Sequence, residues 1–245
     1  MEIYLDLEKT LLNDANTLSK DARKILTDLS LSHSITILST AWLWEIRDIL
    51  DIPNIQIVST VENKLYANHT YDYAPLELNH QMLLPPFKGI YTLYAVLEDT
   101  CYVVSYQERL KNFYPGKKIK LCSQFPKEIS SFIAVLYQKE EDSFLNKITN
   151  YSIQTLASDA KKKMLLITKN PSTKASWLKK LKKSPAIGIG DSISDYEFIG
   201  HCEVQVAMEN ADEELKKLCK YQTPKSNQEN GALDFILSYL KHQQA

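Results

Sequence analysis

The stretch Ile3-Tyr4-Leu5-Asp6-Leu7-Glu8-Lys9-Thr10 sets two carboxylates at the end of an apolar run close to the start of the chain. Residues 3–5 predict a buried β-strand, and Asp6 and Glu8 follow it two positions apart. Side chains two positions apart in an extended segment point the same way. Since ligands of open α/β sheets bind at the carboxyl ends of the strands, we expect both acids to face one crevice.

A second apolar run, residues 186–189, ends in Gly190-Asp191-Ser192-Ile193-Ser194-Asp195. Four acids from the two ends of the sequence would therefore meet in the same crevice. An aspartate can attack phosphorus, a neighbouring acid can transfer protons, and Mg²⁺ favours carboxylate oxygens. Either acidic pair alone is common as a helix cap or a solvated charge. Because each pair follows an apolar strand and precedes a helical pattern, their joint order predicts a phosphoryl-transfer site with bound Mg²⁺.

These motifs resemble those of the haloacid dehalogenase-like hydrolases, in particular the Cof-type and sucrose-phosphatase-like branch, which carries a large cap domain. Asp6-x-Glu8-x-Thr10 is similar to the first motif of that family, which is normally Asp-x-Asp-x-Thr. The other matching segments cover most of the chain: the strand 35–38 with Ser39 and Thr40, Lys174, Gly190-Asp191-x-x-x-Asp195, and Ala207-Met208-Glu209-Asn210-Ala211 with Asn230-Gly231.

The resemblance implies a role for each acid. Asp6 would be the nucleophile, and Glu8 would occupy the general acid/base position and also offer its main-chain carbonyl to Mg²⁺. Asp191 would bind the metal directly, and Asp195 would bind or orient its ligands. The expected metal ligands are therefore Asp6, Glu8, Asp191 and Asp195.

By the same resemblance, Ser39 and Lys174 would hold the oxygens of the transferring phosphoryl group through a hydroxyl and an ammonium. The expected catalytic residues are then Asp6, Glu8, Ser39 and Lys174. The residue types alone leave simpler roles open, since Ser39 could merely end a strand. Lys174 could likewise be a solvated residue of a lysine-rich stretch.

Three further polar residues have structural interpretations. Asp195 lies where a helix is expected to begin, and the helix dipole favours an acid there. Asn210 is interpreted as the N-cap of the helix that carries Leu215 and Leu218. Thr10 is expected to support its loop rather than to react.

Glu8 is the main departure from the family pattern, because it carries the proton-transfer carboxyl one methylene farther from the backbone than aspartate does. Errors of about 1 Å in catalytic geometry can cost on the order of a hundredfold in rate. The outcome could be a slower phosphatase, an adjusted backbone, or a protein that has kept the fold and lost most of its turnover. We expect activity to survive, because glutamate preserves the charge and the titrating group.

Length and composition fit a protein with one large core and a smaller second one, since the chain has 245 residues and is 44% hydrophobic. A net charge of -1 gives no electrostatic case for nucleic acid. The basic runs 161–163 and 179–183 are interpreted as solvated faces. We therefore expect no nucleic-acid partner, no membrane partner, and a monomer or weak homodimer.

The cysteines favour a reducing compartment, because none of them forms a C-x-x-C pair or a zinc-like spacing with histidine. They are expected to be free thiols. No apolar stretch approaches the roughly 20 residues that a membrane-spanning helix needs. A cytoplasmic location follows as the expectation.

The order of the predicted elements favours an α/β fold. Strands and helices alternate at both ends of the chain, whereas the middle carries aromatic, alternating strands. We expect a Rossmann-like, doubly wound parallel sheet as the catalytic core, at residues 1–81 and 166–245. Residues 82–165 are expected to form an inserted α+β cap of the C2 type, built on an antiparallel sheet. Substrate selection would lie in this cap, although Tyr94, Arg109, Tyr137 and Lys139 cannot be ranked as candidates.

Taken with the resemblance, these features predict a Mg²⁺-dependent phosphatase, a phosphoric monoester hydrolase. It would act on a small phosphorylated metabolite, with a sugar phosphate favoured, through an aspartyl-phosphate intermediate. Two alternatives stay open: a phosphomutase, and a catalytically weak phosphate-binding or regulatory protein on the same scaffold.

Overall fold

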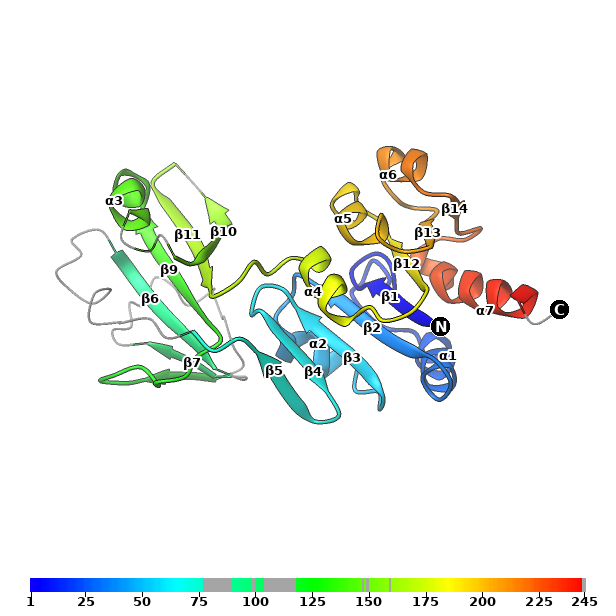
Figure 1. Ribbon diagram of the computed structural model, residues 1–245, viewed down its shortest axis with the longest axis horizontal. Coiled ribbons are helices and arrows are strands. Elements are labelled where there is room, and N and C mark those ends of the chain that lie inside the picture. The colour runs from blue at the N-terminus through cyan, green and yellow to red at the C-terminus, as the bar shows by residue number, and fades with distance from the viewer. Residues whose placement is uncertain are drawn as a thin grey trace.

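The computed structural model contains two β-sheets, one built from both ends of the chain and one from its middle (Figure 1). The structure describes residues 1–76, 90–97, 100–103, 118–146, 148, 150–158 and 160–243. The α/β core with an inserted second sheet confirms the predicted fold class. The predicted domain ranges stay a prediction.

Sheet A forms the core and has eight strands. Its first three strands along the chain pair in parallel and are extended on the other side by three parallel strands from the carboxyl-terminal part. Two antiparallel strands complete one edge. In spatial order the strands are β14 (Tyr221–Gln222), β13 (Val204–Ala207), β12 (Ala186–Gly190), β1 (Glu2–Asp6), β2 (Ser34–Ser39), β3 (Ile55–Ser59), β4 (Lys64–Ala67) and β5 (Thr70–Tyr73).

Helices cover both faces of sheet A (Figure 1). The first and last helices lie together on one face, and the helices that precede and follow β12 lie together on the other. The core helices are α1 (Lys20–Ser30), α2 (Leu43–Ile49), α4 (Lys174–Leu181), α5 (Tyr196–Ile199), α6 (Glu213–Leu218) and α7 (Gly231–Gln243). Because the chain winds outward from β1 in one direction and from β12 in the other, a crevice opens between the carboxyl ends of these strands.

Sheet B is inserted between β5 and α4 and has six strands. We expected an antiparallel sheet, but one edge pair is parallel. In spatial order the strands are β10 (Ser152–Ser158), β11 (Lys162–Thr168), β9 (Ser131–Tyr137), β6 (Ile90–Leu97), β7 (Thr100–Val103) and β8 (Lys118–Leu121), and the short helix α3 (Glu141–Leu145) follows β9.

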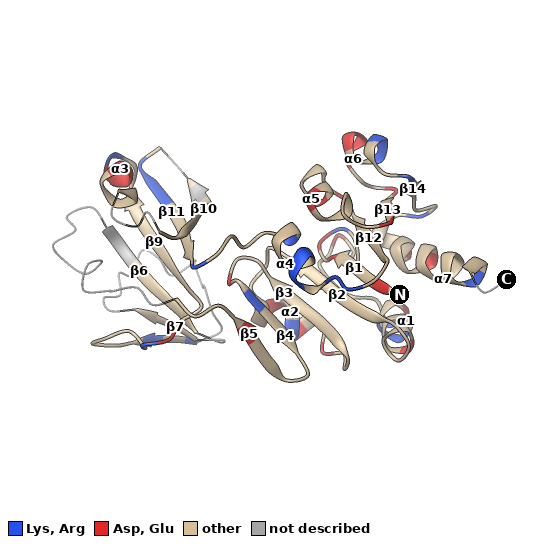
Figure 2. Ribbon diagram, viewed as in Figure 1, with Lys and Arg blue, Asp and Glu red and all other residues tan. Residues whose placement is uncertain are grey.

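The two basic runs lie in different parts of the molecule, one beside and within β11 and the other at the end of α4 (Figure 2). Several of their lysines pair with acids: Lys163 with Glu141, Lys180 with Asp72, and Lys182 with Glu203. The runs therefore form no single basic stripe. Among the described residues, no helix combines the length and apolar character that a membrane crossing requires.

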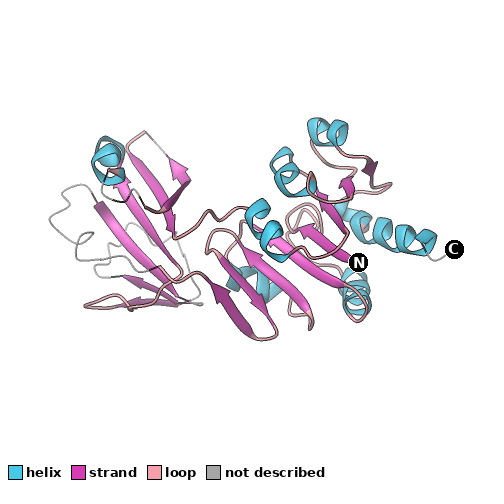
Figure 3. Ribbon diagram, in the orientation of Figure 1, coloured by secondary structure: helices cyan, strands magenta, loops and turns pink. Residues whose placement is uncertain are grey.

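Each sheet has its own apolar core, and Figure 3 shows that most helices belong to the sheet A side. Sheet B is covered on both faces, so β9 is buried along six of its seven residues. Trp42 of the core packs against one of these apolar clusters, whose members include Tyr94 and Cys101. Helix α2 starts at Leu43, with Trp42 as its N-cap residue. Trp42 therefore joins the core to the cap.

A fully buried ion pair lies in the turn between β3 and β4. Lys64 Nζ is 2.8 Å from Glu62 Oε1, and both side chains have 0% exposure. The other carboxylate oxygen of Glu62 accepts a hydrogen bond from the main-chain N–H of Leu43. Because buried charges need partners, each residue of this pair depends on the other.

Breaking the pair from one side should therefore destabilise the protein strongly. We expect Glu62→Gln or Lys64→Met to lower the free energy of unfolding by about 3–5 kcal/mol, because each removes the 2.8 Å ion-pair contact from a charge that stays buried. The double variant Glu62→Gln/Lys64→Met removes both charges and should lie closer to the wild type than the sum of the single changes. Urea unfolding measures these differences.

Lys225→Met is the matched control, because it breaks the exposed Lys225–Asp234 pair. Its effect should stay below about 1 kcal/mol. Additive losses in the double variant would contradict an energetic coupling between Glu62 and Lys64.

Candidate active site

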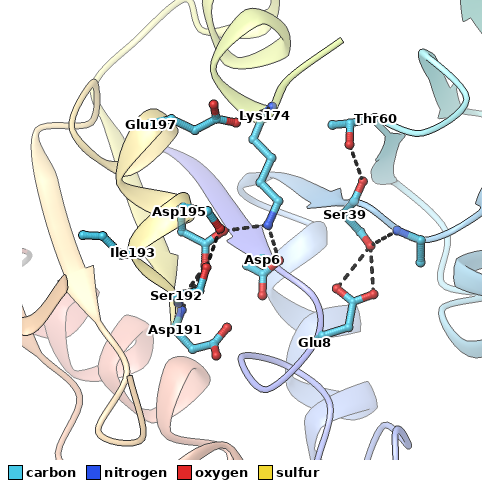
Figure 4. Close-up of polar contacts among 12 residues, drawn as sticks. Asp6, Glu8, Ser39, Thr60, Lys174, Asp191, Ser192, Ile193, Asp195 and Glu197 are labelled. Carbon is cyan, nitrogen blue, oxygen red and sulfur yellow. Dashed lines mark hydrogen bonds and ion pairs between the residues drawn. The ribbon is translucent and has the colours of Figure 1, made fainter. Parts of the chain in front are cut away.

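The ends of three neighbouring strands bring the predicted site residues together (Figure 4). Asp6 is the last residue of β1, Ser39 is the last residue of β2, and Asp191 directly follows β12. Lys174 is the first residue of α4. The parallel pairing of β1 with both β2 and β12 places these residues, which are far apart in sequence, at the carboxyl ends of neighbouring strands in the middle of sheet A.

Three of the four expected acids form a tight cluster. Carboxylate oxygens of Asp6, Asp191 and Asp195 all lie within 4.8 Å of one another. Asp195 Oδ2 accepts hydrogen bonds from the main-chain N–H groups of Asp191 and Ser192, both at 3.1 Å. Asp195 thus holds the turn after β12 and also presents a carboxylate oxygen to the cluster, and its role at a metal ion stays a prediction.

Gly190 makes this arrangement possible. A Cβ atom at position 190 would lie 2.5 Å from Asp195 Oδ2, far inside van der Waals contact. Any side chain there would push the Asp195 carboxylate away from the strand end. The glycine of the Gly-Asp pair is therefore a packing requirement of the acidic cluster.

Lys174 lies between two of the aspartates. Its Nζ is 2.5 Å from Asp6 Oδ1 and 2.6 Å from Asp195 Oδ1, and its main-chain N–H donates to Glu197 Oε1 at 2.9 Å. The residue is buried, so it is not a solvated lysine of a basic run. Burial alone would lower the pKa of Lys174, but the carboxylates of Asp6 and Asp195 outweigh it and raise the pKa overall.

Glu8 lies apart from the aspartate cluster and turns toward β2 (Figure 4). The Ser39 hydroxyl donates to its carboxylate, at 3.1 Å from Oε1 and 3.2 Å from Oε2, and accepts from the main-chain N–H of Ala41 at 2.9 Å. We expected the four acids to meet in one crevice, and all four line it, with Asp6, Asp191 and Asp195 forming the tight group and Glu8 bound to Ser39. The extra methylene of glutamate gives Glu8 the reach to contact Ser39.

The acidic cluster carries more negative charge than its one lysine offsets. Burial raises the pKa of Asp6 to about 8, with the Lys174 ammonium opposing this rise and Asp195 adding to it. Burial, followed by the charge of Asp195, also raises the pKa of Asp191. A bound cation would remove this excess charge. The donor set, three carboxylates close enough to share one ion, fits a hard divalent cation.

The cluster lines an open crevice of about 320 Å³, together with Glu8, Lys9 and Thr40. A second cavity of about 290 Å³ lies along α2, β3 and β4 and is lined by Arg47, Tyr66 and His69 among others. Only the first holds the aspartate cluster. We therefore place the candidate active site in the crevice at the carboxyl ends of β1 and β12.

Asn210 is not the N-cap that the sequence predicted. Helix α6 begins at Glu213, with Asp212 as its N-cap residue. Asn210 Nδ2 instead donates to the main-chain oxygen of Lys9 at 2.9 Å, and its Oδ1 accepts from the N–H of Asn227 at 3.0 Å. The prediction was wrong because the helix starts later, which leaves Asn210 in the loop where it can bridge these distant segments.

For two neighbouring residues of the first motif, the sequence predicted a role for Thr10 but none for Lys9. Thr10 is buried, and its hydroxyl has no hydrogen-bond partner among the described residues, so its supporting role stays a prediction. Lys9 was not singled out, although it lines the crevice. Its place between Glu8 and Thr10 was the available signal, but the direction of its side chain depends on a backbone conformation that the sequence does not reveal.

The cap candidates have different environments. Tyr94 is packed in the cap interior with 1% exposure, so it is a core residue there. Tyr137 and Lys139 are exposed. Arg109 lies outside the described residues.

Solved structures with the same fold cover nearly the whole chain. A haloacid dehalogenase-like hydrolase from Bacteroides thetaiotaomicron matches 97% of this chain and 98% of its own, with a TM-score of 0.71 and 18% identity. A protein from Eubacterium rectale covers the same shares with a TM-score of 0.75 and 13% identity. A further Bacteroides thetaiotaomicron protein, described among phosphatases of this superfamily, has a TM-score of 0.65 and 14% identity over 97% of this chain and 94% of its own.

At these identities the structural likenesses establish a shared fold. No curated protein matches the sequence. A family model described as haloacid dehalogenase-like hydrolase matches residues 3–236, a span that includes every motif at the crevice. The chain therefore belongs to the haloacid dehalogenase-like hydrolases, in their Cof-type branch.

Proposed function

We propose that this protein is a Mg²⁺-dependent phosphatase that hydrolyses a small phosphorylated metabolite, with a sugar phosphate as the favoured class. The observation that carries the proposal is the buried Asp6 carboxylate at the end of β1, held by Lys174 beside two further aspartates. The fold relationship to a protein described among phosphatases supports the same reaction class.

In the proposed reaction, a carboxylate oxygen of Asp6 attacks the phosphorus atom and the bond between phosphorus and the ester oxygen breaks. The departing oxygen takes a proton from Glu8, and an aspartyl-phosphate remains on Asp6. Water then attacks this phosphorus, giving a proton back to the Glu8 carboxylate. Asp6 is released with inorganic phosphate as the product.

Lys174 and Ser39 are proposed to hold the phosphoryl oxygens. The Lys174 ammonium already orients Asp6 through a 2.5 Å contact, so it can fix the nucleophile and offset charge that develops on the phosphoryl group. The Ser39 hydroxyl donates to the Glu8 carboxylate. It could keep orienting Glu8 or donate instead to a phosphoryl oxygen of the substrate. Both residues act from regular elements, which limits their movement.

The side chains of Asp6, Asp191 and Asp195, with the main-chain carbonyl of Glu8, are proposed to hold Mg²⁺. The ion, when bound, supplies positive charge that reduces the repulsion between the carboxylate nucleophile and the phosphate dianion. The cap, joined to the core through Trp42, is proposed to exclude water and select the substrate.

One observation favours a second candidate, a catalytically weak phosphate-binding protein. The Glu8 carboxylate contacts Ser39 rather than the aspartate cluster, so proton transfer requires it to leave this hydrogen bond or to act from it. The turnover measurements below separate the two candidates.

Replacing the nucleophile should abolish turnover. We expect Asp6→Asn to reduce phosphate release at least about a thousandfold, because the amide cannot form the aspartyl-phosphate. The measurement is Mg²⁺-dependent phosphate release from sugar phosphates, nucleotides and p-nitrophenyl phosphate. Asp28→Asn, an exposed change on α1, is the matched control and should keep wild-type rates. Wild-type release no greater than that of Asp6→Asn would reject the phosphatase proposal and favour the binding protein.

Mg²⁺ binding should strengthen as the pH rises. The folded-state pKa of Asp6 is raised to about 8 from 3.8, so the metal-free folded protein holds a proton on Asp6 more tightly than the unfolded chain does. The stability that this proton gives to the folded state is lost as the pH rises between those two values. Mg²⁺ must displace the proton, so the rise in Tm caused by Mg²⁺ should be larger near about pH 8 than near about pH 6. Asp6→Asn should weaken this pH dependence. An equal Mg²⁺-induced rise at both pH values would contradict a proton on the metal-free cluster.

Glu8 should still transfer protons. We expect Glu8→Gln to lower kcat about a hundredfold, because the amide can neither give nor take the proton, while Glu8→Asp retains turnover. Steady-state kinetics on the best ester of the panel measure both. If wild type and Glu8→Asp are equally inactive with every ester while both bind Mg²⁺, the proposed role of Glu8 is wrong.

A further inference from the structure

Lys9 has a backbone conformation that lysine rarely adopts. Its φ angle is 53°, in the left-handed region that disfavours side chains with a Cβ atom. Among the described residues, seven non-glycine positions have positive φ, and apart from Lys9 they are five asparagines and one histidine. Asparagine and histidine tolerate this region, whereas lysine gains nothing from it. A glycine or asparagine at position 9 would satisfy the turn at lower free energy.

The surrounding structure holds Lys9 in this conformation. Asn210 Nδ2 donates to the Lys9 main-chain oxygen at 2.9 Å, and Asn210 is itself bound to the N–H of Asn227. The main-chain N–H groups of Leu11 and Leu12 both donate to the main-chain oxygen of Leu7, each at 3.0 Å. These two hydrogen bonds close the loop around Lys9. Backbone strain that is held in this way at a candidate active site points to a role for the side chain.

The Lys9 side chain belongs to the crevice. It is exposed and lines the same cavity as Asp6, Glu8 and Asp191. Its ammonium has no ion-pair partner within 4.0 Å among the described residues, yet it is near enough to act electrostatically on Asp191. Lys174, the other lysine of this cavity, is already engaged by two carboxylates. Lys9 is therefore the lysine of the described crevice whose ammonium is available to an arriving anion.

We propose that Lys9 is a substrate-binding residue whose ammonium contacts the phosphate oxygens of the substrate at the mouth of the crevice. This inference rests on the proposed function, since it assigns Lys9 to the same site. The contact adds positive charge beside Asp191, where the crevice is otherwise acidic, and so favours the entry of a phosphate dianion. Its contribution is to binding, and therefore to KM more than to kcat.

The charge argument also separates this role from an effect on the metal. An ammonium near Asp191 repels Mg²⁺, so Lys9 weakens the binding of the ion that the aspartates attract. A role in metal binding therefore does not explain a lysine at this position. Bound phosphate reverses the sign, because Lys9 then faces an anion. The attraction of Lys9 to phosphate thus exists only with substrate present, whereas its attraction to the Asp191 carboxylate exists without it.

The test measures the binding of inorganic phosphate to the Mg²⁺-saturated protein by calorimetry, for the wild type and for Lys9→Gly, Lys9→Gln and Lys9→Arg. We expect Lys9→Gly and Lys9→Gln to raise the Kd for phosphate about tenfold, and Lys9→Arg to stay within about threefold. Lys9→Gly should not lower Tm, because glycine relieves the strained φ angle. Lys24→Gln on α1 makes the same charge change at an exposed site outside the crevice and should leave the Kd unchanged.

Phosphate affinity unchanged in Lys9→Gly and Lys9→Gln would overturn the inference. It would equally be overturned if Mg²⁺ affinity changed while the phosphate Kd at saturating Mg²⁺ did not. Because binding is measured without turnover, the outcome is independent of the phosphatase test: loss of phosphate affinity in a protein that hydrolyses no ester would support Lys9 and reject the proposed reaction.

Discussion

The bridge from Lys174 to Asp6 and Asp195 is the interaction on which the site depends. These two acids come from distant parts of the sequence, Asp6 at the end of β1 and Asp195 in the 3-10 turn after β12, and their like charges repel. A buried ammonium at 2.5 and 2.6 Å from them makes the arrangement stable enough to exist in the folded protein. The lysine is in turn fixed at the start of α4, so the segment that returns from the cap is bonded to Asp6, the proposed nucleophile.

The remaining negative charge is what a bound cation would offset. One lysine cannot neutralise three clustered aspartates, and burial leaves Asp6 and Asp191 with raised pKa values. Either protons or a metal ion must supply the missing positive charge. The same excess of negative charge would repel a phosphate dianion, so binding of substrate and binding of cation are coupled by electrostatics.

The loop after β1 distinguishes this chain from the usual pattern of its family. Glu8 replaces the shorter aspartate and reaches the Ser39 hydroxyl, while Lys9 occupies a strained turn and brings a second ammonium to the crevice. The loop is held by Asn210 and by the hydrogen bonds that close on Leu7. The residue types in this loop therefore set the charge and reach of the groups around Asp6.

The sequence by itself determined the α/β alternation, the inserted sheet, and the identity of the residues at the strand ends, because these depend on local hydrophobic periodicity and on short motifs. The tertiary structure alone decided the contacts that need segments far apart in sequence: Lys174 between two aspartates, Glu8 turned toward Ser39, and Asn210 bonded to Lys9 instead of capping α6. It also decided the parallel edge pair of the cap and the left-handed turn at Lys9. Strand pairing, side-chain reach and the sign of φ are set by packing around a residue, and no local pattern of residue types encodes them.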